Sequence, residues 1–207
     1  MHSRSFPLAF AHSIAHIALF SRVKNSSQLR QRLITASTLP DDSEGDKERQ
    51  VVDYAFIDAG MITSRLHLLT AVSQALLAQA EDNLKSKTLH SEVIWMLEPG
   101  SNISEALKHF GLSATTKDLL LVRIQPETAS DTPQEIEEGM KSIVEGEIAS
   151  LDLLGKLPGG GTNEKSLRKI YKLNGDAALG SLKPETEEYK RIFDELVTSS
   201  TALKSVM

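Results

Sequence analysis

The sequence contains no cysteine and few aromatic residues, with six Phe, three Tyr and one Trp among 207 positions. The lack of thiols excludes a disulfide scaffold, a cysteine zinc site and a cysteine nucleophile. Long apolar runs are also missing: the stretch Phe6 to Phe20 is interrupted by polar residues and is shorter than the ~20 residues that a bilayer requires. We therefore expect no membrane partner, and the same interruptions argue against a secretion signal.

Charge is unevenly distributed along the chain. Lys and Arg total 23 against 28 Asp and Glu, which gives a formal net charge of −5. Residues 1–40 carry five basic residues and no acidic one, whereas residues 125–160 carry eight acids and two lysines. This asymmetry permits a local basic surface on an acidic protein. The acid-free start is compatible either with a first strand that enters the core or with a mitochondrial presequence.

Hydrophobic periodicity predicts an α/β fold with a mixed β-sheet of about four strands flanked by helices and a helical C-terminal third. The expected strands are 16–23, 51–57, 93–97 and 119–124, and the expected helices are 63–80, 103–110, 133–144, 166–173 and 184–203, with one more after Ser26. We expect one domain over residues 1–207, with polar loop insertions near 40–50, 125–133, 155–165 and 174–183.

Three local signals fix helix ends in this scheme. Asn102 with Glu105, and Thr132 with Glu135, match the capping box, and Pro133 suits the first helical position. Gly111 is expected to end its helix in the left-handed conformation.

Catalytic motifs are absent from the sequence. The run GGGTNEKS lacks the Gly-Lys pair of a phosphate-binding loop, and no G-x-S-x-G elbow occurs. His12 and His16 would share one face of a strand, but no acidic ligand lies near them in sequence. We therefore expect neither a metal nor a cofactor, and no enzymatic activity.

One enzymatic alternative stays open. A small α/β enzyme could use Glu92, His67 or His90 as an acid or base in a pocket. We expect His67 on the flank of a helix with its ring in water. Glu92 interrupts an apolar segment, so it either faces solvent or is a buried carboxylate paired with Lys87 or Arg65.

The last helix carries a stripe of large apolar side chains. Such a stripe at a chain end either closes the domain's own core or binds another protein. Its members are Tyr189, Ile192, Phe193, Leu196 and Val197.

Several blocks of the sequence, in this order, resemble a known family. They are YAFIDAGMITSRLHLLTAVSQAL (Tyr54 to Leu76), KTLHSEVIWML (Lys87 to Leu97) with SNISEALKHFGL (Ser101 to Leu112), KDLLLVRI (Lys117 to Ile124) and RKIYKL (Arg168 to Leu173). They look like the PRPK-binding protein (TPRKB) family, the small accessory subunit of the KEOPS (EKC) complex, in its fungal form.

This resemblance implies a non-catalytic adaptor. Such a subunit binds the atypical kinase PRPK, partly through its terminal helices, and contacts the other KEOPS subunits through that kinase. It also helps to recruit tRNA by its single-stranded 3′ end for threonylcarbamoyladenosine modification, which another subunit performs. A link to telomere maintenance and a location in the nucleus and cytoplasm are implied as well.

Within the family blocks and beside them we expect an RNA-binding patch. Basic and stacking groups gathered locally would hold RNA on an acidic protein, although scattered solvated charges are the alternative. The candidates are Arg65, His67, Lys85, Lys87 and Lys108. For the kinase we expect the stripe from Tyr189 to Val197 to form the interface core, so that Phe193→Ala weakens kinase binding without unfolding the protein.

Overall fold

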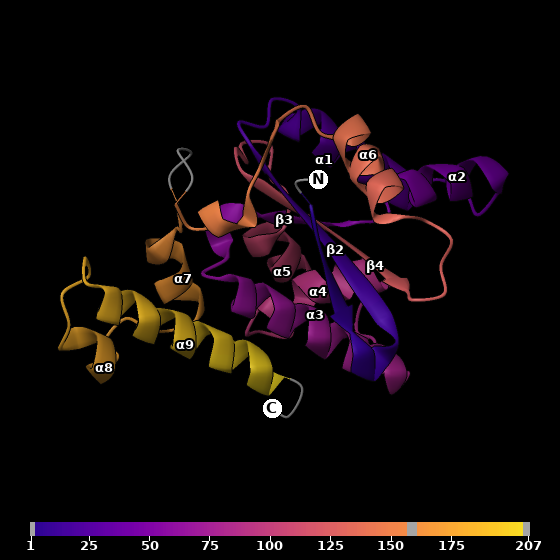
Figure 1. The fold of residues 1–207 in the computed structure, drawn as a ribbon. Coiled ribbons are helices and arrows are strands. Elements are labelled where there is room, and N and C mark those ends of the chain that lie inside the picture. The colour runs from indigo at the N-terminus through magenta and orange to yellow at the C-terminus, as the bar shows by residue number, and fades with distance from the viewer. Residues whose placement is uncertain (1–2, 157–160, 205–207) are drawn as a thin grey trace.

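A central β-sheet organises the chain in the computed structural model, which describes residues 3–156 and 161–204 (Figure 1). The elements in chain order are β1 (Arg4–Leu8), η1 (Ala9–Ala11), β2 (Ser13–Ser21), α1 (Ser26–Thr38), α2 (Ser43–Val51), β3 (Ala55–Asp58), η2 (Ala59–Met61), α3 (Arg65–Ala80), α4 (Leu89–Leu97), α5 (Ile103–Phe110), β4 (Leu119–Pro126), α6 (Pro133–Ile143), β5 (Glu147–Ala149), η3 (Leu151–Leu153), α7 (Glu164–Ile170), α8 (Ala177–Gly180) and α9 (Glu187–Leu203).

The five strands of the described residues pair in the order β1-β2-β4-β3, with β5 added to the end of β2. Each of these pairings is antiparallel. In β4, Leu120 and Val122 face one core, and Leu119 and Leu121 face the other. Burial on both faces explains the continuous apolar run of this strand.

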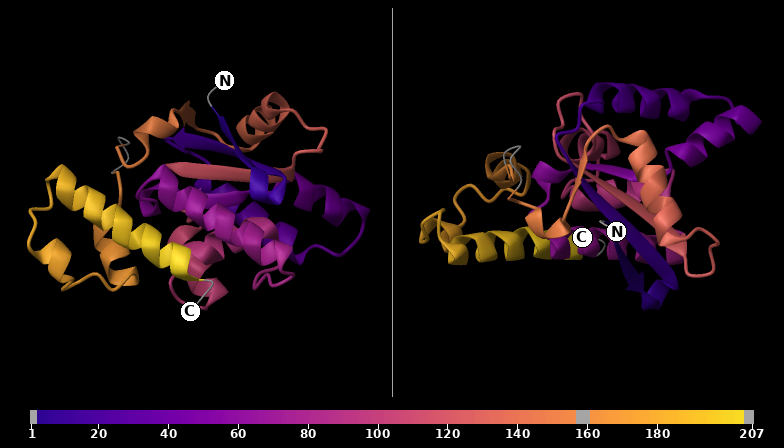
Figure 2. Two further views of the ribbon diagram at one scale, coloured as in Figure 1. Left: turned by 60° about the horizontal axis from the view of Figure 1, so that its bottom comes forward. Right: turned by 45° about the horizontal axis from the view of Figure 1, so that its top comes forward.

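Two helical layers cover the sheet. Helices α3 and α4 pack on one face, and α9 lies along α3 on the outside of that layer (Figures 1 and 2). The opposite face is covered by α6 and α1 through Ile136, Met140 and Leu29. The expected α/β fold with a helical C-terminal third is confirmed. Among the described residues, every helix is too short or too polar to cross a bilayer.

The predicted strand at 93–97 is wrong, because these residues form the second half of α4. The apolar run VIWML is buried on several sides of a short helix and therefore shows no helical alternation. The start of this helix is set by a capping box in which Thr88 and Ser91 satisfy each other's backbone amides.

Two other local predictions also need correction. The segment expected to be a loop at 40–50 contains α2, whose first turn is capped by the Asp42 carboxylate. Gly111 ends α5 with an ordinary φ of −77°. A glycine is nevertheless required there, because a Cβ atom would lie only 2.4 Å from the Leu107 carbonyl oxygen.

Of the other expected loops, one is mostly irregular and one contains a short helix. The 125–133 segment is mostly irregular, and the predicted capping box at Thr132 and Glu135 is confirmed. The 174–183 segment includes the short helix α8. Residues 157–160 of the third expected loop lie outside the described residues.

Candidate interaction surfaces

The apolar stripe of α9 lies inside the domain. Tyr189 and Val197 are only 1% and 0% exposed, and Phe193 is also buried against the layer that contains α3. The Tyr189 and Phe193 rings stack with their centroids 6.2 Å apart. The expectation that these three form a surface for the kinase is therefore wrong, since the alternative of an internal core applies. Ile192 and Leu196 are half-buried at the edges of the stripe.

His67 is completely buried at the seam between α3 and α9. The Thr63 backbone N–H donates to Nδ1 at 3.4 Å, so the ring proton is on Nε2, which donates to the Tyr171 hydroxyl at 3.1 Å. Tyr171 in turn donates to the Leu97 carbonyl at 2.5 Å. Burial lowers the pKa of His67 to about 3, so the ring is neutral at physiological pH.

This burial corrects two expectations about His67. Its ring is not in water, and it is not available to an RNA strand. Nor is it available as an acid or base for a substrate, because both ring nitrogens are engaged by the protein. The role that the geometry supports is structural. Through Thr63, which donates to Asp194 of α9 at 2.5 Å, the network fixes α9 to α3.

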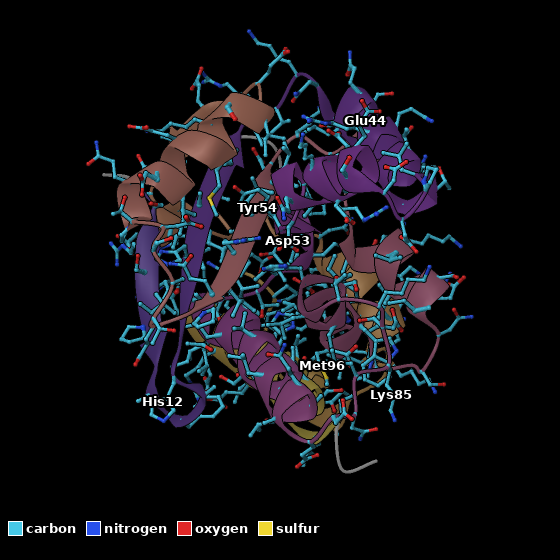
Figure 3. All side chains as sticks on the ribbon, turned by 90° about the vertical axis from the view of Figure 1, so that its right-hand side faces the viewer. His12, Glu44, Asp53, Tyr54, Lys85 and Met96 are labelled. Carbon is cyan, nitrogen blue, oxygen red and sulfur yellow. The ribbon has the colours of Figure 1, made fainter. Side chains whose placement is uncertain are left out.

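The four other basic candidates do not form one patch. Arg65 is at the start of α3, 3.5 Å from the Asp152 carboxylate, whereas Lys85 follows the end of that helix. The sixteen-residue helix that lies between them is about 24 Å long. Lys108 lies in α5, 3.7 Å from Glu105. Only Lys85 and Lys87 share one loop, whose position is shown by Lys85 in Figure 3.

The loop that carries Lys85 and Lys87 is anchored by Glu92. This carboxylate is fully buried, and its Oε2 accepts from the backbone N–H of Lys85 at 3.0 Å and from the Ser86 N–H at 2.7 Å. The Ser86 hydroxyl donates to the same oxygen at 2.6 Å. The buried alternative for Glu92 is therefore right, but its partners are two backbone amides and the Ser86 hydroxyl rather than the side chain of Lys87 or Arg65.

Asp53 and His90 resemble a catalytic dyad at the edge of the sheet. His90 Nδ1 lies 2.7 Å from Asp53 Oδ1, and Arg123 also donates to this carboxylate. Burial alone would raise the pKa of Asp53, but the hydrogen bond from His90 and the charges of His90 and Arg123 outweigh it and hold the pKa below its usual range. Figure 3 shows Asp53 beside Tyr54 on this side of the molecule.

The second ring nitrogen of His90 is also hydrogen-bonded within the protein. Nε2 accepts the backbone N–H of Ile124 at 2.9 Å. Because β3 begins only at Ala55, opposite Val122, the Ile124 amide lies beyond the part of β4 that pairs with β3, and the imidazole satisfies it. Both ring nitrogens are therefore used, which leaves none to take a proton from a substrate.

The two histidines considered for a metal are separated by the fold. His12 is exposed at the turn after η1, whereas His16 is buried in β2 with its Nδ1 2.9 Å from the Ser5 hydroxyl. Across residues 3–156 and 161–204, no group of three or more His, Asp or Glu side chains is arranged to hold a metal ion.

Lys204 closes the C-terminal end of the helical layer. Its buried ammonium donates to the carbonyl oxygens of Trp95, Glu98 and Gly100, the last at 3.0 Å. Desolvation lowers the pKa of Lys204 to about 8. The free carbonyls at the end of α4 are thereby satisfied by a cation from the far end of the chain.

The outward face of α3 is the main exposed apolar surface near these elements. Leu66 and Leu77, three turns apart on one stripe, are 63% and 42% exposed. Thr70 and Ser73 lie between them on the same face. Phe10, 56% exposed in η1, belongs to the β1–β2 hairpin, which packs against α3 on the side away from α9. Figure 2 (left) shows α3 facing the viewer between α9 and this hairpin.

Of the two buried charged residues in these sites, the sequence singled out Glu92 and gave no indication of Lys204. Glu92 offered a signal, since a carboxylate inside an apolar run has to find donors. Lys204 offered none, because a lysine near a chain end is ordinarily solvated. Its partners are backbone carbonyls about a hundred residues away in sequence.

Comparison with known proteins gives a consistent result. The model of the family described as kinase binding protein CGI-121 matches residues 20–205. The EKC/KEOPS complex subunit CGI121 of Cryptococcus neoformans is 32% identical, with 95% of each chain covered. The subunit of the same name from Gibberella zeae is also 32% identical, over 92% of this chain and 91% of the relative. That from Coccidioides immitis is 33% identical over 79% of this chain and 72% of the relative.

Proposed function

Because the chain belongs to the kinase binding protein CGI-121 family, we propose that it is a non-catalytic adaptor subunit of an EKC/KEOPS complex and binds the atypical kinase of that complex. The relatives' names and the similarity over nearly the whole chain support this role. The three acid–base candidates of the enzymatic alternative, His67, Glu92 and His90, all form hydrogen bonds within the protein. Their structural roles are consistent with a non-catalytic subunit.

The observation that carries the proposal is the exposed apolar face of α3. A protein interface needs apolar anchors at its centre and polar groups around them. Leu66, Leu77 and Phe10 supply such anchors on a rigid helix and an adjacent hairpin. Ile192 and Leu196, half-buried along α9, extend this surface on its other side. The stripe predicted from the sequence is thus replaced by the α3 face, and only its two edge residues stay in the proposed interface.

The adaptor also helps to recruit tRNA for threonylcarbamoyladenosine modification. It does so by binding the single-stranded 3′ end of the tRNA. Lys85 and Lys87 are the best placed of the predicted contacts, because Glu92 fixes the backbone of their loop while both side chains project from it. Phosphate contacts of this kind give affinity without sequence preference. The role in telomere maintenance and the location in nucleus and cytoplasm belong to the same proposal.

A reconstitution with the purified kinase and an unmodified tRNA transcript tests the adaptor role. We expect the three components to elute together in size-exclusion chromatography, with less tRNA retained when this chain is left out. With Lys85→Ala and Lys87→Ala combined, the kinase stays bound and tRNA retention falls. If the chain binds no kinase, or if tRNA retention is the same without it, the corresponding half of the proposal is wrong.

A further inference from the structure

A second basic surface lies on α7, far along the chain from the Lys85 loop. Lys165 and Lys169 are exposed one turn apart on α7, and the exposed Lys172 follows shortly after the helix ends at Ile170. Between residues 161 and 175 the only acid is Glu164, against these three lysines and Arg168, a local balance of +3. Within the described residues, no ion pair joins any of the three lysines to a carboxylate.

The one nearby acid is already engaged. Glu164 accepts a hydrogen bond from the Tyr189 hydroxyl and lies 3.7 Å from the Arg168 guanidinium. Asp176, the next acid along the chain, caps α8 by accepting from the amides of Ala178 and Leu179. The lysine charges therefore remain uncompensated at the surface.

Helix α7 holds these charges on a fixed support. Leu167 on the inner face of α7 is completely buried. The backbone N–H of Asn163, the residue before the helix, donates to the Gly60 carbonyl at 2.7 Å. Tyr171 at its end belongs to the buried network of His67. Because backbone and side-chain contacts fix both ends of α7, the spacing between its lysines is defined before any partner arrives.

The same face of α7 is hollowed. An open depression of about 560 Å³ is lined by Glu164, Lys165, Arg168, Lys169 and Asn174. Every lining residue is charged or an amide, and the apolar part of the lining is therefore supplied by the stems of these long side chains. It offers no aromatic or branched aliphatic side chain of the kind around which a protein interface is built. A chain of phosphates needs no such anchor, since its affinity comes from point charges.

We propose that the α7 lysines bind the phosphodiester backbone of a nucleic-acid strand. Lys165 and Lys169 lie about 6 Å apart along the helix axis, which is close to the rise of two phosphates in a stacked strand. The absence of stacking side chains from the hollow predicts contact with the backbone rather than with bases. This inference rests on the proposed role in tRNA recruitment and adds a second contact to it.

Fluorescence anisotropy with a labelled oligouridine, titrated with salt, tests this site. The full-length chain with Lys165→Gln, Lys169→Gln and Lys172→Gln should bind roughly tenfold more weakly at low salt. The slope of log K against log salt should become shallower by about 2, since each lost phosphate contact contributes ~0.7 on a single strand. A matched control changes three exposed lysines elsewhere, Lys24, Lys47 and Lys117, to Gln and should leave both quantities unchanged.

An oligothymidine of equal length and a polyglutamate peptide complete the experiment. The ratio of oligouridine to oligothymidine affinity assigns the strand to RNA or to DNA, and the triple variant should weaken both. Polyglutamate binding as tight as oligouridine binding would overturn the proposal in favour of an acidic protein. Wild-type binding that the triple variant retains in full would contradict only the α7 site. If the wild-type chain binds neither strand, the α7 site and the tRNA half of the proposed function both fail, while kinase binding is unaffected.

Discussion

The ammonium nitrogen of Lys204 lies 3.4 Å from the centroid of the Trp95 ring. It therefore combines a cation–π contact with hydrogen bonds to the carbonyls that follow α4. This single side chain joins the end of α9 to the turn between α4 and α5. Together with the His67 network at the other end of the seam, it holds the C-terminal helix against α3.

Stability should rise with pH above 8 because of Lys204. Its pKa is about 8 in the folded protein and ~10.4 in the unfolded chain, so the unfolded state binds more protons between these values. From pH 7.5 to 9.5 this contributes about 2 kcal/mol to the free energy of unfolding. The difference between wild type and Lys204→Met in urea denaturation measures it, and parallel pH profiles would contradict a buried, charged Lys204.

His67 should make the protein sensitive to acid. Its folded pKa of about 3 lies below the unfolded value of 6.5, so stability falls as the pH decreases between them. The expected loss is about 1.4 kcal/mol per pH unit in that window. The His67→Leu variant should lack this component. Denaturation curves at pH 6, 5 and 4 measure the two slopes, and equal slopes would show that His67 titrates normally.

Phe193→Ala should destabilise the domain rather than act on binding alone. A buried Phe stacked on Tyr189 leaves a cavity when truncated, which costs about 3–5 kcal/mol. The exposed Leu203 on the same helix is the control, and Leu203→Ala should change stability by less than about 0.5 kcal/mol. Urea denaturation compares the two variants. A Phe193→Ala protein as stable as wild type would place this ring outside the core.

The order of elements was largely predictable, because most of them carry their own pattern. The apolar run of β4 and the capping box of α6 needed no knowledge of the rest of the chain. Helix α4 was mistaken for a strand since a short, fully buried apolar run has no periodicity that separates the two. Helix α2 was missed because it is polar and exposed, and so has no apolar stripe to mark it as a helix. It is held to α1 by an ion pair between Arg32 and Glu48, at 2.5 Å, which the local sequence does not predict.

The surfaces were less predictable than the elements. The stripe of α9 was visible in the sequence, but whether it faces a partner or its own core depends on the position of α3. Arg65 and Lys85 are close in sequence, yet a whole helix separates them in space. The exposed face of α3 could not be recognised because this helix is apolar on nearly every side, and only packing shows which side stays uncovered.

The central claim is that the chain binds the kinase through the outer face of α3, and calorimetric titration of the purified kinase tests it most directly. The combined Leu66→Asp and Leu77→Asp changes should weaken binding at least a hundredfold, about 2.7 kcal/mol, without lowering the melting temperature. The control is Ile34→Asp on α1, where the isoleucine is as exposed as Leu77. This variant should bind the kinase as wild type does. Wild-type affinity in the double variant would contradict the account.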